Sequence, residues 1–301
     1  MEKVAVVTGA NKGIGYGIVK GLCQKFDGII YLTARDEKRG QDALKSIKDL
    51  NVCKHPEKLR FHKLDILDQG SIQALHNDLQ AQHGGLDILI NNAAIAFKNS
   101  ATESFGQQAE VTLQTNYFAL VTLCHMLFPL LRPYARVVNL SSSAGHLSNM
   151  AEGELKQKLL DNSLTEEQLS KIMNDFVNLA KEGKHAEVGW PNSAYSVSKI
   201  GVSKLSFIQH ATLSKDTTRP GIIVNPVHPG YVDTDMTSHK GPLTIDEGAH
   251  SSLVAALVPQ DAKEPRGQFI WFDGNIVNWD GPKPISVNAM RAAQAAQSKS
   301  N

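Results

Sequence analysis

Cysteine is scarce in this sequence, and the few residues present are far apart. Cys23, Cys53 and Cys124 form no CxxC pair, and their odd number argues against a disulfide framework or a cysteine-bound metal. We therefore predict no metal site. Net charge is also nearly absent, because 31 basic residues face 30 acidic ones. No strong field exists to attract nucleic acid or an anionic membrane surface, so neither is expected as a partner.

Long apolar runs are missing as well. No stretch of eighteen apolar residues occurs, so no membrane span is expected. The first residues, MEKVAVVTGANKG, contain no long apolar stretch behind a basic region, and no secretory signal is expected. Together with the unpaired cysteines, these features predict a protein that works in the cytoplasm.

Short apolar runs alternate along the chain with longer amphipathic segments. A nearly continuous apolar run is typical of a parallel strand that is buried on both faces. The expected strands are 4–8, 28–33, 59–65, 86–91, 136–141, 221–227 and 268–272, and the clearest helices are 37–50, 71–82 and 111–131. Regular alternation predicts an α/β fold in which helices cover both faces of a parallel sheet. We expect a doubly wound, seven-stranded parallel sheet in one domain, residues 1–280.

Two segments interrupt this alternation. Residues 149–190 are polar and helical in pattern, and we expect them to be a helical insertion packed on the sheet domain. Its longer helix has Ser163 or Thr165 as the candidate N-cap and an apolar stripe at helical spacing. The Ala/Gln/Ser-rich residues 281–301 are expected to form a flexible tail.

A glycine-rich turn, TGANKGIG, follows the first expected strand. It contains Gly9, Gly13 and Gly15 and leads into a helix that begins near Ile14. Backbone N–H groups at such a helix N-terminus bind anions, and the absence of Cβ atoms lets a pyrophosphate approach. The spacing differs from GxGxxG, and a glycine turn alone can serve the backbone only. Its position at the first strand-to-helix junction favours a dinucleotide site.

The end of the second strand, LTARDEKRG, indicates which dinucleotide is bound. Arg35 stands near the place where NAD-binding folds usually carry an acid for the ribose hydroxyl, and a guanidinium suits a 2′-phosphate. Lys12 in the glycine turn adds a second cation. We therefore predict NADPH as the cofactor. The alternatives are that both cations are solvated surface residues, or that Asp36 binds a ribose.

The heptapeptide SAYSVSK places Tyr195 and Lys199 four residues apart, hence on one face of a helix. A nearby ammonium favours the phenolate, so we expect Lys199 to lower the pKa of Tyr195. Such a tyrosine can donate a proton to a carbonyl oxygen while hydride reaches the carbon. Two further features support a reaction centre: serines follow the fifth strand in VVNLSSSAG, and Asn116 lies in a helix interior, where asparagine is unfavourable.

Taken together, these motifs resemble those of the short-chain dehydrogenase/reductase family, whose members have a Rossmann fold. TGANKGIG matches the cofactor turn of that family, INNAA its NNAG element, SSSAG its serine strand, YSVSK its YxxxK pair and HPGYVDTDM its PG segment. The resemblance covers the chain from Val4 to about Trp279. Within the family, NKGIG, LTARD, GWPNSAYSVSKIGV and the insertion resemble the NADPH-dependent carbonyl reductases, which include enzymes similar to 20β-hydroxysteroid dehydrogenase.

The resemblance implies roles for particular residues. Tyr195 is the general acid, Ser142 bonds the carbonyl oxygen, Lys199 binds the nicotinamide ribose and Asn116 supports the proton relay. Tyr231 joins Ser142 and Tyr195 in the substrate pocket. The implied cofactor-binding residues, besides Tyr195 and Lys199, are Gly9, Asn11, Lys12, Gly13, Ile14, Gly15, Arg35, Asp65, Ile66, Asn91, Pro229, Gly230, Val232 and Thr234.

Some positions depart from the family pattern or leave a choice. Ala94 replaces the glycine of NNAG, and Tyr231 stands where close relatives carry Trp. Ser142 is chosen over Ser141 and Ser143 by alignment only. His228, beside the PG turn, is expected to be structural.

The resemblance implies NADPH-dependent reduction of aldehydes, ketones or quinones. Alternatives are a steroid- or prostaglandin-specific dehydrogenase, a nucleotide-sugar epimerase, or a sensor that binds NADP(H) without turnover. The small remainder after the seventh strand disfavours the epimerase, and the intact catalytic set disfavours the sensor. The insertion precedes the YxxxK helix, through which many relatives associate, so we expect it to cover that helix and leave the protein a monomer.

Overall fold

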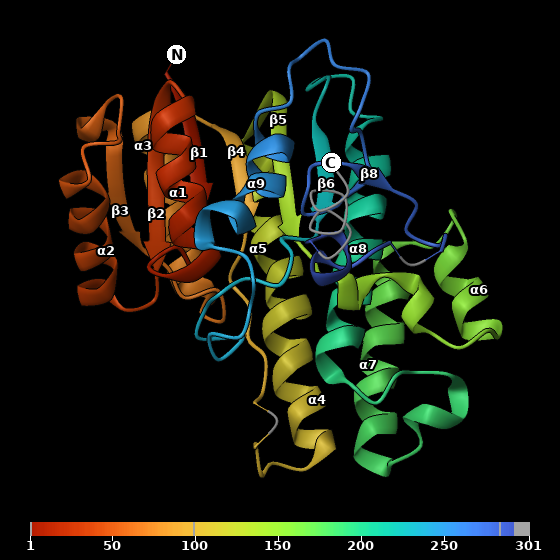
Figure 1. Ribbon diagram of the computed structural model, residues 1–301. Coiled ribbons are helices and arrows are strands. Elements are labelled where there is room, and N and C mark those ends of the chain that lie inside the picture. The colour runs from red at the N-terminus through yellow and green to blue at the C-terminus, as the bar shows by residue number, and fades with distance from the viewer. Residues whose placement is uncertain (1, 99, 283, 292–301) are drawn as a thin grey trace, which may run out of the picture.

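A single sheet forms the centre of the molecule in the computed structural model, which describes residues 2–98, 100–282 and 284–291 (Figure 1). The strand order is β3-β2-β1-β4-β5-β6-β7-β8. The strands are β1 (Lys3–Val7), β2 (Gly28–Ala34), β3 (Leu59–Lys63), β4 (Leu86–Asn91), β5 (Leu131–Leu140), β6 (Ile223–Val227), β7 (Phe269–Ile270) and β8 (Ile276–Val277). The order reverses between β1 and β4, as in a doubly wound sheet.

All seven predicted strands are present and pair in parallel, with ends shifted by a few residues. The prediction of a seven-stranded, wholly parallel sheet was wrong at one edge. An eighth strand, β8, runs antiparallel to β7. A tight turn explains the reversal: Gly274 has φ 86°, and Trp271 N–H donates to the Asn275 carbonyl at 2.8 Å. An antiparallel pair needs only such a turn, whereas a parallel pair needs a long crossover.

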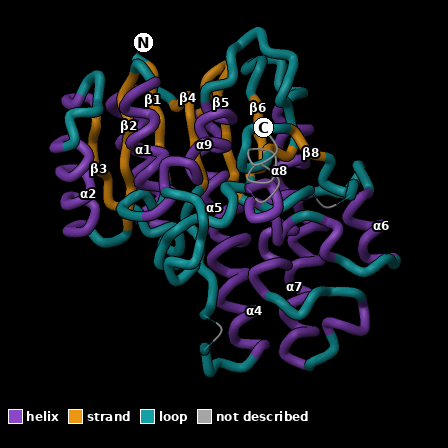
Figure 2. The backbone as a smooth tube through the Cα atoms, in the orientation of Figure 1, coloured by secondary structure: helices purple, strands orange, loops and turns teal. Residues whose placement is uncertain are grey.

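Helices cover both faces of the sheet (Figure 2). Because successive strand residues point to opposite faces, Ala5 and Val7 pack on one side and Val4 and Val6 on the other. The first side is covered by α1 (Gly13–Lys25), α2 (Glu37–Asp49) and α9 (Ile245–Ala256). The second is covered by α3 (Gln69–His83), α5 (Ala119–Leu127) and α8 (Ala194–Leu213).

The helix expected at 111–131 is longer and less regular than predicted. It begins with α4 (Phe105–Leu113), which is capped by Ser104 and Gln107, passes through a π-helical segment, Gln114–Phe118, and continues as α5. Among the described residues it is the one helix long and apolar enough to cross a membrane, but 56% of its most apolar window is buried. It packs on other helices of the fold, as the core helix of a globular domain does.

The insertion contains α6 (Glu154–Leu160) and α7 (Glu166–Glu182) and extends beside α4 below the sheet (Figure 1). Thr165, not Ser163, is the N-cap of α7, in a reciprocal capping box with Gln168. The apolar stripe of α7 is buried against α4 and α8, as its helical spacing predicts; it comprises Leu169, Met173, Phe176, Val177 and Ala180, with Ile172 partly buried. Amphipathic spacing alone therefore places this helix on the domain.

The predicted flexible tail was wrong for residues 284–291. Val287 is 4% exposed within the core, and the Arg291 guanidinium donates to the Pro242 carbonyl at 2.7 Å and pairs with Glu247 at 2.9 Å. The apolar residues of this segment are scattered among polar ones, so no periodic pattern in the sequence indicated that it packs on the domain. The rest of the predicted tail, residues 292–301, lies outside the described residues.

Two of the widely spaced cysteines meet in the fold. The thiol of Cys23, on α1, is within hydrogen-bonding reach of Cys53, and Lys54 N–H donates to the Cys23 carbonyl at 3.0 Å. Burial, followed by this contact, raises the pKa of the Cys23 thiol well above its usual range. The thiol of Cys23 is therefore held in its neutral form.

Candidate functional site

Parallel pairing brings the candidate residues to one edge of the sheet. The carboxyl ends of β1, β4, β5 and β6 are neighbours there. The glycine turn follows β1, Asn92 follows β4, the three serines follow β5 and His228 follows β6. In open α/β sheets the ligand crevice forms outside these ends, where the strand order reverses.

The glycine turn is packed closely at Gly9 and Gly15, where an added Cβ would meet neighbouring atoms at 3.0 Å or less. Gly9 has φ 62°, and a Cβ on Gly15 would lie 2.5 Å from Asn92 Nδ2 and 2.6 Å from the Gly9 carbonyl. Lys12, the N-cap of α1, gives the helix no side-chain hydrogen bond within the described chain. The first N–H groups of α1 therefore remain available to an anion, as a bound pyrophosphate requires.

Asn92 holds this turn, and the sequence analysis missed it. Its Nδ2 donates to the carbonyls of Thr8 at 2.9 Å and Gly9 at 3.0 Å. Asn91, the residue expected at the strand edge, points inward, where its Nδ2 donates to Asn139 Oδ1 at 2.8 Å. Strand alternation explains the difference, because Asn91 is in register with Asn139 on the neighbouring strand. The second Asn of the INNAA motif could have indicated this role of Asn92.

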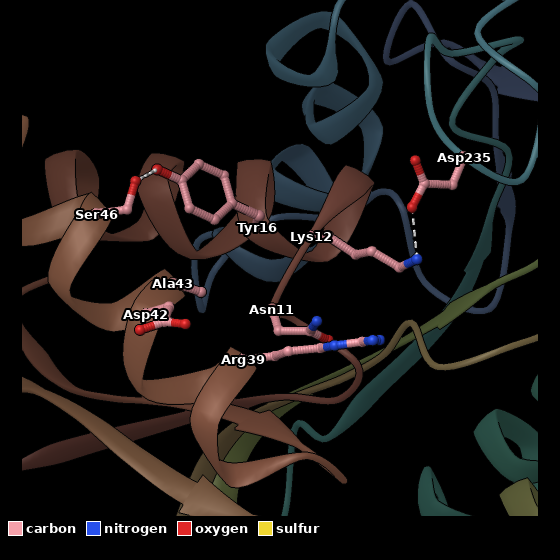
Figure 3. A pocket seen from close by; sticks show the side chains of 8 residues that line it. All are labelled: Asn11, Lys12, Tyr16, Arg39, Asp42, Ala43, Ser46 and Asp235. Carbon is pink, nitrogen blue, oxygen red and sulfur yellow. Dashed lines mark hydrogen bonds and ion pairs between the residues drawn. The ribbon is translucent and has the colours of Figure 1, made fainter.

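A pocket of about 620 Å³ lies beside the glycine turn (Figure 3). Its lining comprises Asn11, Lys12, Tyr16, Arg39, Asp42, Ala43, Ser46 and Asp235. In Figure 3 the Arg39 side chain reaches from α2 to Asn11, and Lys12 pairs with Asp235 at 2.6 Å. Arg35 is exposed and is not part of this lining. The pocket thus presents the predicted cation Lys12 together with Arg39, which the sequence analysis overlooked although it lies in the first turn after β2.

Asp36 has a structural role in this region. Its side chain is the N-cap of α2 and accepts a hydrogen bond from Arg39 N–H at 2.9 Å. It also lies 3.8 Å from Arg39 Nε. The carboxylate is thus engaged with its own helix, which disfavours the ribose-binding alternative.

Two of the predicted cofactor-binding residues, Asp65 and Ile66, lie after β3. Asp65 accepts a hydrogen bond from Leu67 N–H at 3.0 Å, so its carboxylate shapes the turn after β3. Ile66 lines a small internal cavity together with Asn91, Asn116 and Lys199.

The three serines after β5 have different environments. Ser141 is buried, and its hydroxyl is bonded to Ser203 at 2.7 Å and to the Lys199 carbonyl at 3.0 Å. Ser142 is the residue whose side chain interacts with the Tyr195 hydroxyl, and it also accepts from Ala144 N–H at 3.1 Å. The geometry therefore favours Ser142 as the serine beside the tyrosine.

Asn116 lies at the centre of the π-helical segment. Its Oδ1 accepts from Ile95 N–H at 2.8 Å, and its Nδ2 donates to the Ile95 carbonyl at 2.9 Å and to Ser198 Oγ at 3.1 Å. π-helical turns are unfavourable and often mark functional sites. Here the segment ties the loop after β4 to α8, one residue before Lys199.

Lys199 is buried beside Tyr195. Its ammonium donates to the Leu140 carbonyl at 2.6 Å and lies 5.7 Å from the centre of the Tyr195 ring. Burial lowers the pKa of Lys199 to about 8. The net pKa of Tyr195 is raised and not lowered as expected, because burial outweighs the interaction with Ser142, which lowers it. The phenol is consequently protonated at neutral pH and is a proton donor.

The PG segment closes the other side of the crevice. Gly230 has φ 88°, and a Cβ there would lie 2.3 Å from Leu243 Cδ1. Thr234 lies against the glycine turn, 3.4 Å from where a Gly13 Cβ would be. The Val232 side chain, expected at the cofactor, packs in the core, so only its backbone can face the crevice. Tyr231 is 44% exposed.

Comparison with known proteins agrees with this geometry. A family model for short chain dehydrogenases matches residues 3–153. The chain is 47% identical to carbonyl reductase (NADPH) 1 of Mus musculus over 278 residues, which are 92% of this chain and 98% of that protein. Salutaridine reductase of Papaver somniferum has a similar structure, with a TM-score of 0.77 and 31% identity over 89% of this chain and 99% of that one. NADPH-bound carbonyl reductase from chicken fatty liver matches with a TM-score of 0.65 and 26% identity over 93% and 99% of the two chains.

The buried ammonium generates a prediction about stability. The Lys199 pKa falls from 10.5 to about 8 on folding. Below pH 8 Lys199 is protonated in both the folded and the unfolded protein. Burying its charge then destabilises the folded state by the full amount, about 3 kcal/mol. The cost is relieved as pH rises from about 8 to 10.5. Lys199→Met should therefore raise Tm by a few degrees at pH 7, even after losing a hydrogen bond worth about 1 kcal/mol.

Thermal unfolding of the two proteins between pH 7 and pH 10 tests this expectation. The advantage of Lys199→Met should shrink as pH rises, because the wild-type lysine then loses its charge. A lower Tm at pH 7, or an advantage that does not depend on pH, would contradict it.

Proposed function

Because this chain belongs to the short-chain dehydrogenase family, we propose that its site works as an NADPH-dependent carbonyl reductase. The observation that carries the proposal is the meeting of Ser142, Tyr195, Lys199 and Asn116 beside the glycine turn. A protonated phenol, a hydroxyl next to it and an ammonium behind it are the groups that carbonyl reduction needs.

The residues present fit NADPH. The glycine turn leaves no room for a side chain at Gly9 or Gly15 and exposes the N-terminus of α1, where a pyrophosphate would lie. Lys12, Arg39 and Asn11 line the neighbouring pocket and would hold the 2′-phosphate. When bound, NADPH supplies the hydride that is added to the carbonyl carbon.

Side chains of the protein supply the proton that the carbonyl oxygen receives. Ser142 donates a hydrogen bond to the carbonyl oxygen and keeps it near the Tyr195 hydroxyl. Tyr195 then gives its proton to that oxygen as negative charge develops there. Lys199 is cationic below its pKa of about 8 and stabilises the phenolate that remains. Asn116 positions α8, and thus Tyr195 and Lys199, against the loop after β4.

The substrate class we propose is small aldehydes, ketones and quinones. Tyr231 and Met236, on the PG segment, are 44% and 40% exposed, and we propose that they form an open, apolar side of the site. An open side suits carbonyl compounds of varied shape, whereas a steroid- or prostaglandin-specific dehydrogenase requires a closely fitting pocket. A substrate panel with NADPH separates these alternatives.

The first functional prediction concerns the proton donor. Tyr195→Phe keeps the ring and removes the acidic proton, so turnover of a quinone should fall by about 10²–10⁴-fold. NADPH binding, followed by fluorescence, should stay close to that of the wild type. Tyr134→Phe is the matched control, because Tyr134 is exposed at the opposite end of β5. Turnover by Tyr195→Phe at the rate of the control would refute the assignment.

The second functional prediction concerns coenzyme preference. Arg39 lines the pocket and Arg35 does not, so Arg39→Ala should weaken NADPH binding by about 10-fold. Arg35→Ala should have the smaller effect, although Arg35 was the cation indicated by the sequence. NADH has no 2′-phosphate, and its affinity should change little in either variant. Equal weakening of both coenzymes by Arg39→Ala would mean that Arg39 only supports the fold.

We further propose that the protein is a monomer, because the insertion covers α8. Ten consecutive residues of α8, 197–206, are buried, which leaves no side of this stretch free. Gly201 has room for no side chain, since a Cβ would lie 2.8 Å from Met173 Sδ of α7. Lys204 Nζ donates to the Asp161 carbonyl of the insertion at 2.8 Å.

Light scattering after size-exclusion chromatography tests the oligomeric state. The expected mass is that of one chain, unchanged on tenfold dilution, since a helix face buried by its own chain cannot also pair with a copy. A stable dimer or tetramer would show that association uses another surface.

A cytoplasmic location is part of the proposal. Support comes from the small and odd number of cysteines, which fits a reducing compartment. Fractionation of the source cells would test it.

A further inference from the structure

His228 occupies the space between the serine loop and the PG turn. It follows the last residue of β6 and is 6% exposed. It has no expected role in proton transfer or coenzyme binding. Its contacts nevertheless reach both loops that flank the proposed reaction centre.

A single ring nitrogen of His228 accepts hydrogen bonds from both loops. Its Nδ1 lies 3.0 Å from the backbone N–H of Ser143 and 3.3 Å from that of Gly230. Both partners can only donate, so Nδ1 carries a lone pair and no proton. One acceptor thus fixes the residue after Ser142 and the glycine of the PG turn relative to each other.

Both the backbone and the ring of His228 are held in place. The backbone N–H of His228 donates to the Ile270 carbonyl at 2.8 Å, and the His228 carbonyl accepts from Ser251 Oγ at 3.1 Å. The imidazole packs on Trp271, with ring centres 4.3 Å apart, and its edge meets Phe272. Burial lowers the pKa of His228 to about 3, so the ring stays neutral and both hydrogen bonds persist at working pH.

The serine loop is also held by Asn149, whose Nδ2 donates to the carbonyls of Ser143 at 2.8 Å and Ala144 at 3.1 Å, but it is His228 that accepts from the N–H groups of Ser143 and Gly230. Ser142 is the N-cap of a single turn of 3₁₀-helix, Ser143–Gly145, and its hydroxyl faces Tyr195 from there. Gly230 begins the segment that runs past Tyr231 to Thr234 at the glycine turn. A shift of the Ser143 N–H would move the Ser142 hydroxyl. A shift of the Gly230 N–H would move the PG segment on the other side of the crevice.

We propose that His228 is a positioning residue for carbonyl reduction: its Nδ1 aligns Ser142 with the PG segment by accepting one hydrogen bond from each loop. The proposal rests on the proposed function. His228 touches neither of the reacting groups and acts through Ser142. Loss of the acceptor would leave two partly buried N–H groups without their protein partner, and we expect the loops to move apart as a result.

Two substitutions at His228 separate the acceptor from the bulk of the ring. His228→Leu fills the space without an acceptor, whereas His228→Asn can present Oδ1 near the place of Nδ1. His210 supplies matched controls, because it is also a histidine with a pKa lowered by burial, to about 4, and its Nδ1 accepts from Val224 N–H at 3.4 Å. It lies near the end of α8 that is remote from Tyr195.

The measurements are kcat and KM with a quinone, the Kd for NADPH and Tm, for both pairs of variants. His228→Leu should lower kcat by about 10–100-fold, the cost of misplacing a group by about 1 Å. Its Kd for NADPH should change less than about threefold, since coenzyme affinity depends chiefly on the glycine turn and the cationic pocket. His228→Asn should recover most of kcat. His210→Leu should lower Tm and leave kcat within about twofold, because it is far from the site.

Several outcomes would overturn the proposal. They are a His228→Leu enzyme with wild-type kcat, a His228→Asn enzyme as impaired as His228→Leu, and an equal loss of kcat in His210→Leu. If His228→Leu does not fold, His228→Gln replaces it, because its acceptor extends past the Nδ1 position. A wild-type protein that reduces no carbonyl compound would refute the proposed function instead.

A double substitution tests the route of action. In a Ser142→Ala background, His228→Leu should lower kcat by less than about threefold more, because residues that act as a unit are not additive. A full additional loss would show that His228 does not act through Ser142.

Discussion

Parallel hydrogen bonding among β1, β4, β5 and β6 is the constraint on which the site depends. Because parallel strands end at the same edge, segments that are far apart in sequence become neighbours there. Each strand delivers one part: the glycine turn, Asn92, the serine loop and the PG turn. The edge is then joined across strands by side chains, Asn92 between β1 and β4 and His228 between β5 and β6.

Local rules of stability are broken around this edge, and the rest of the fold compensates. Asn116 sits in a π-helical segment, and Lys199 is an ammonium buried with one carbonyl partner. Gly9 and Gly230 hold positive φ angles at close backbone approaches. The π-helical segment and the buried ammonium cost stability, yet they place Asn116 and Lys199 beside α8 and Tyr195. The large apolar clusters on both faces of the sheet supply the compensation.

The insertion changes the surroundings of the catalytic helix. Helix α7 covers α8 through an apolar stripe, and Lys204 is bonded to the insertion backbone. Burial of residues 197–206 of α8 holds Lys199, and the helical turn that begins at Tyr195, in place within one chain. The insertion thus links the proposed monomeric state to the rigidity of the site.

The sequence by itself determined the seven parallel strands, the glycine turn and the Tyr195–Lys199 pair, and it narrowed the N-cap of α7 to Ser163 or Thr165. These features depend on residues close together in the chain, whose spacing reports periodicity and turn chemistry directly. Motif order added Ser142 and Asn116, which the structure brings beside Tyr195 and α8.

Only the tertiary structure decided which of several neighbouring residues faces the site. It selected Asn92 over Asn91 for the turn and placed Arg39, not Arg35, in the pocket. It also added the antiparallel β8, anchored residues 284–291, joined Cys23 to Cys53, and reversed the expected direction of the Tyr195 pKa. Each of these depends on burial or on contact between distant segments, and no pattern of adjacent residues encodes the depth at which a side chain will lie.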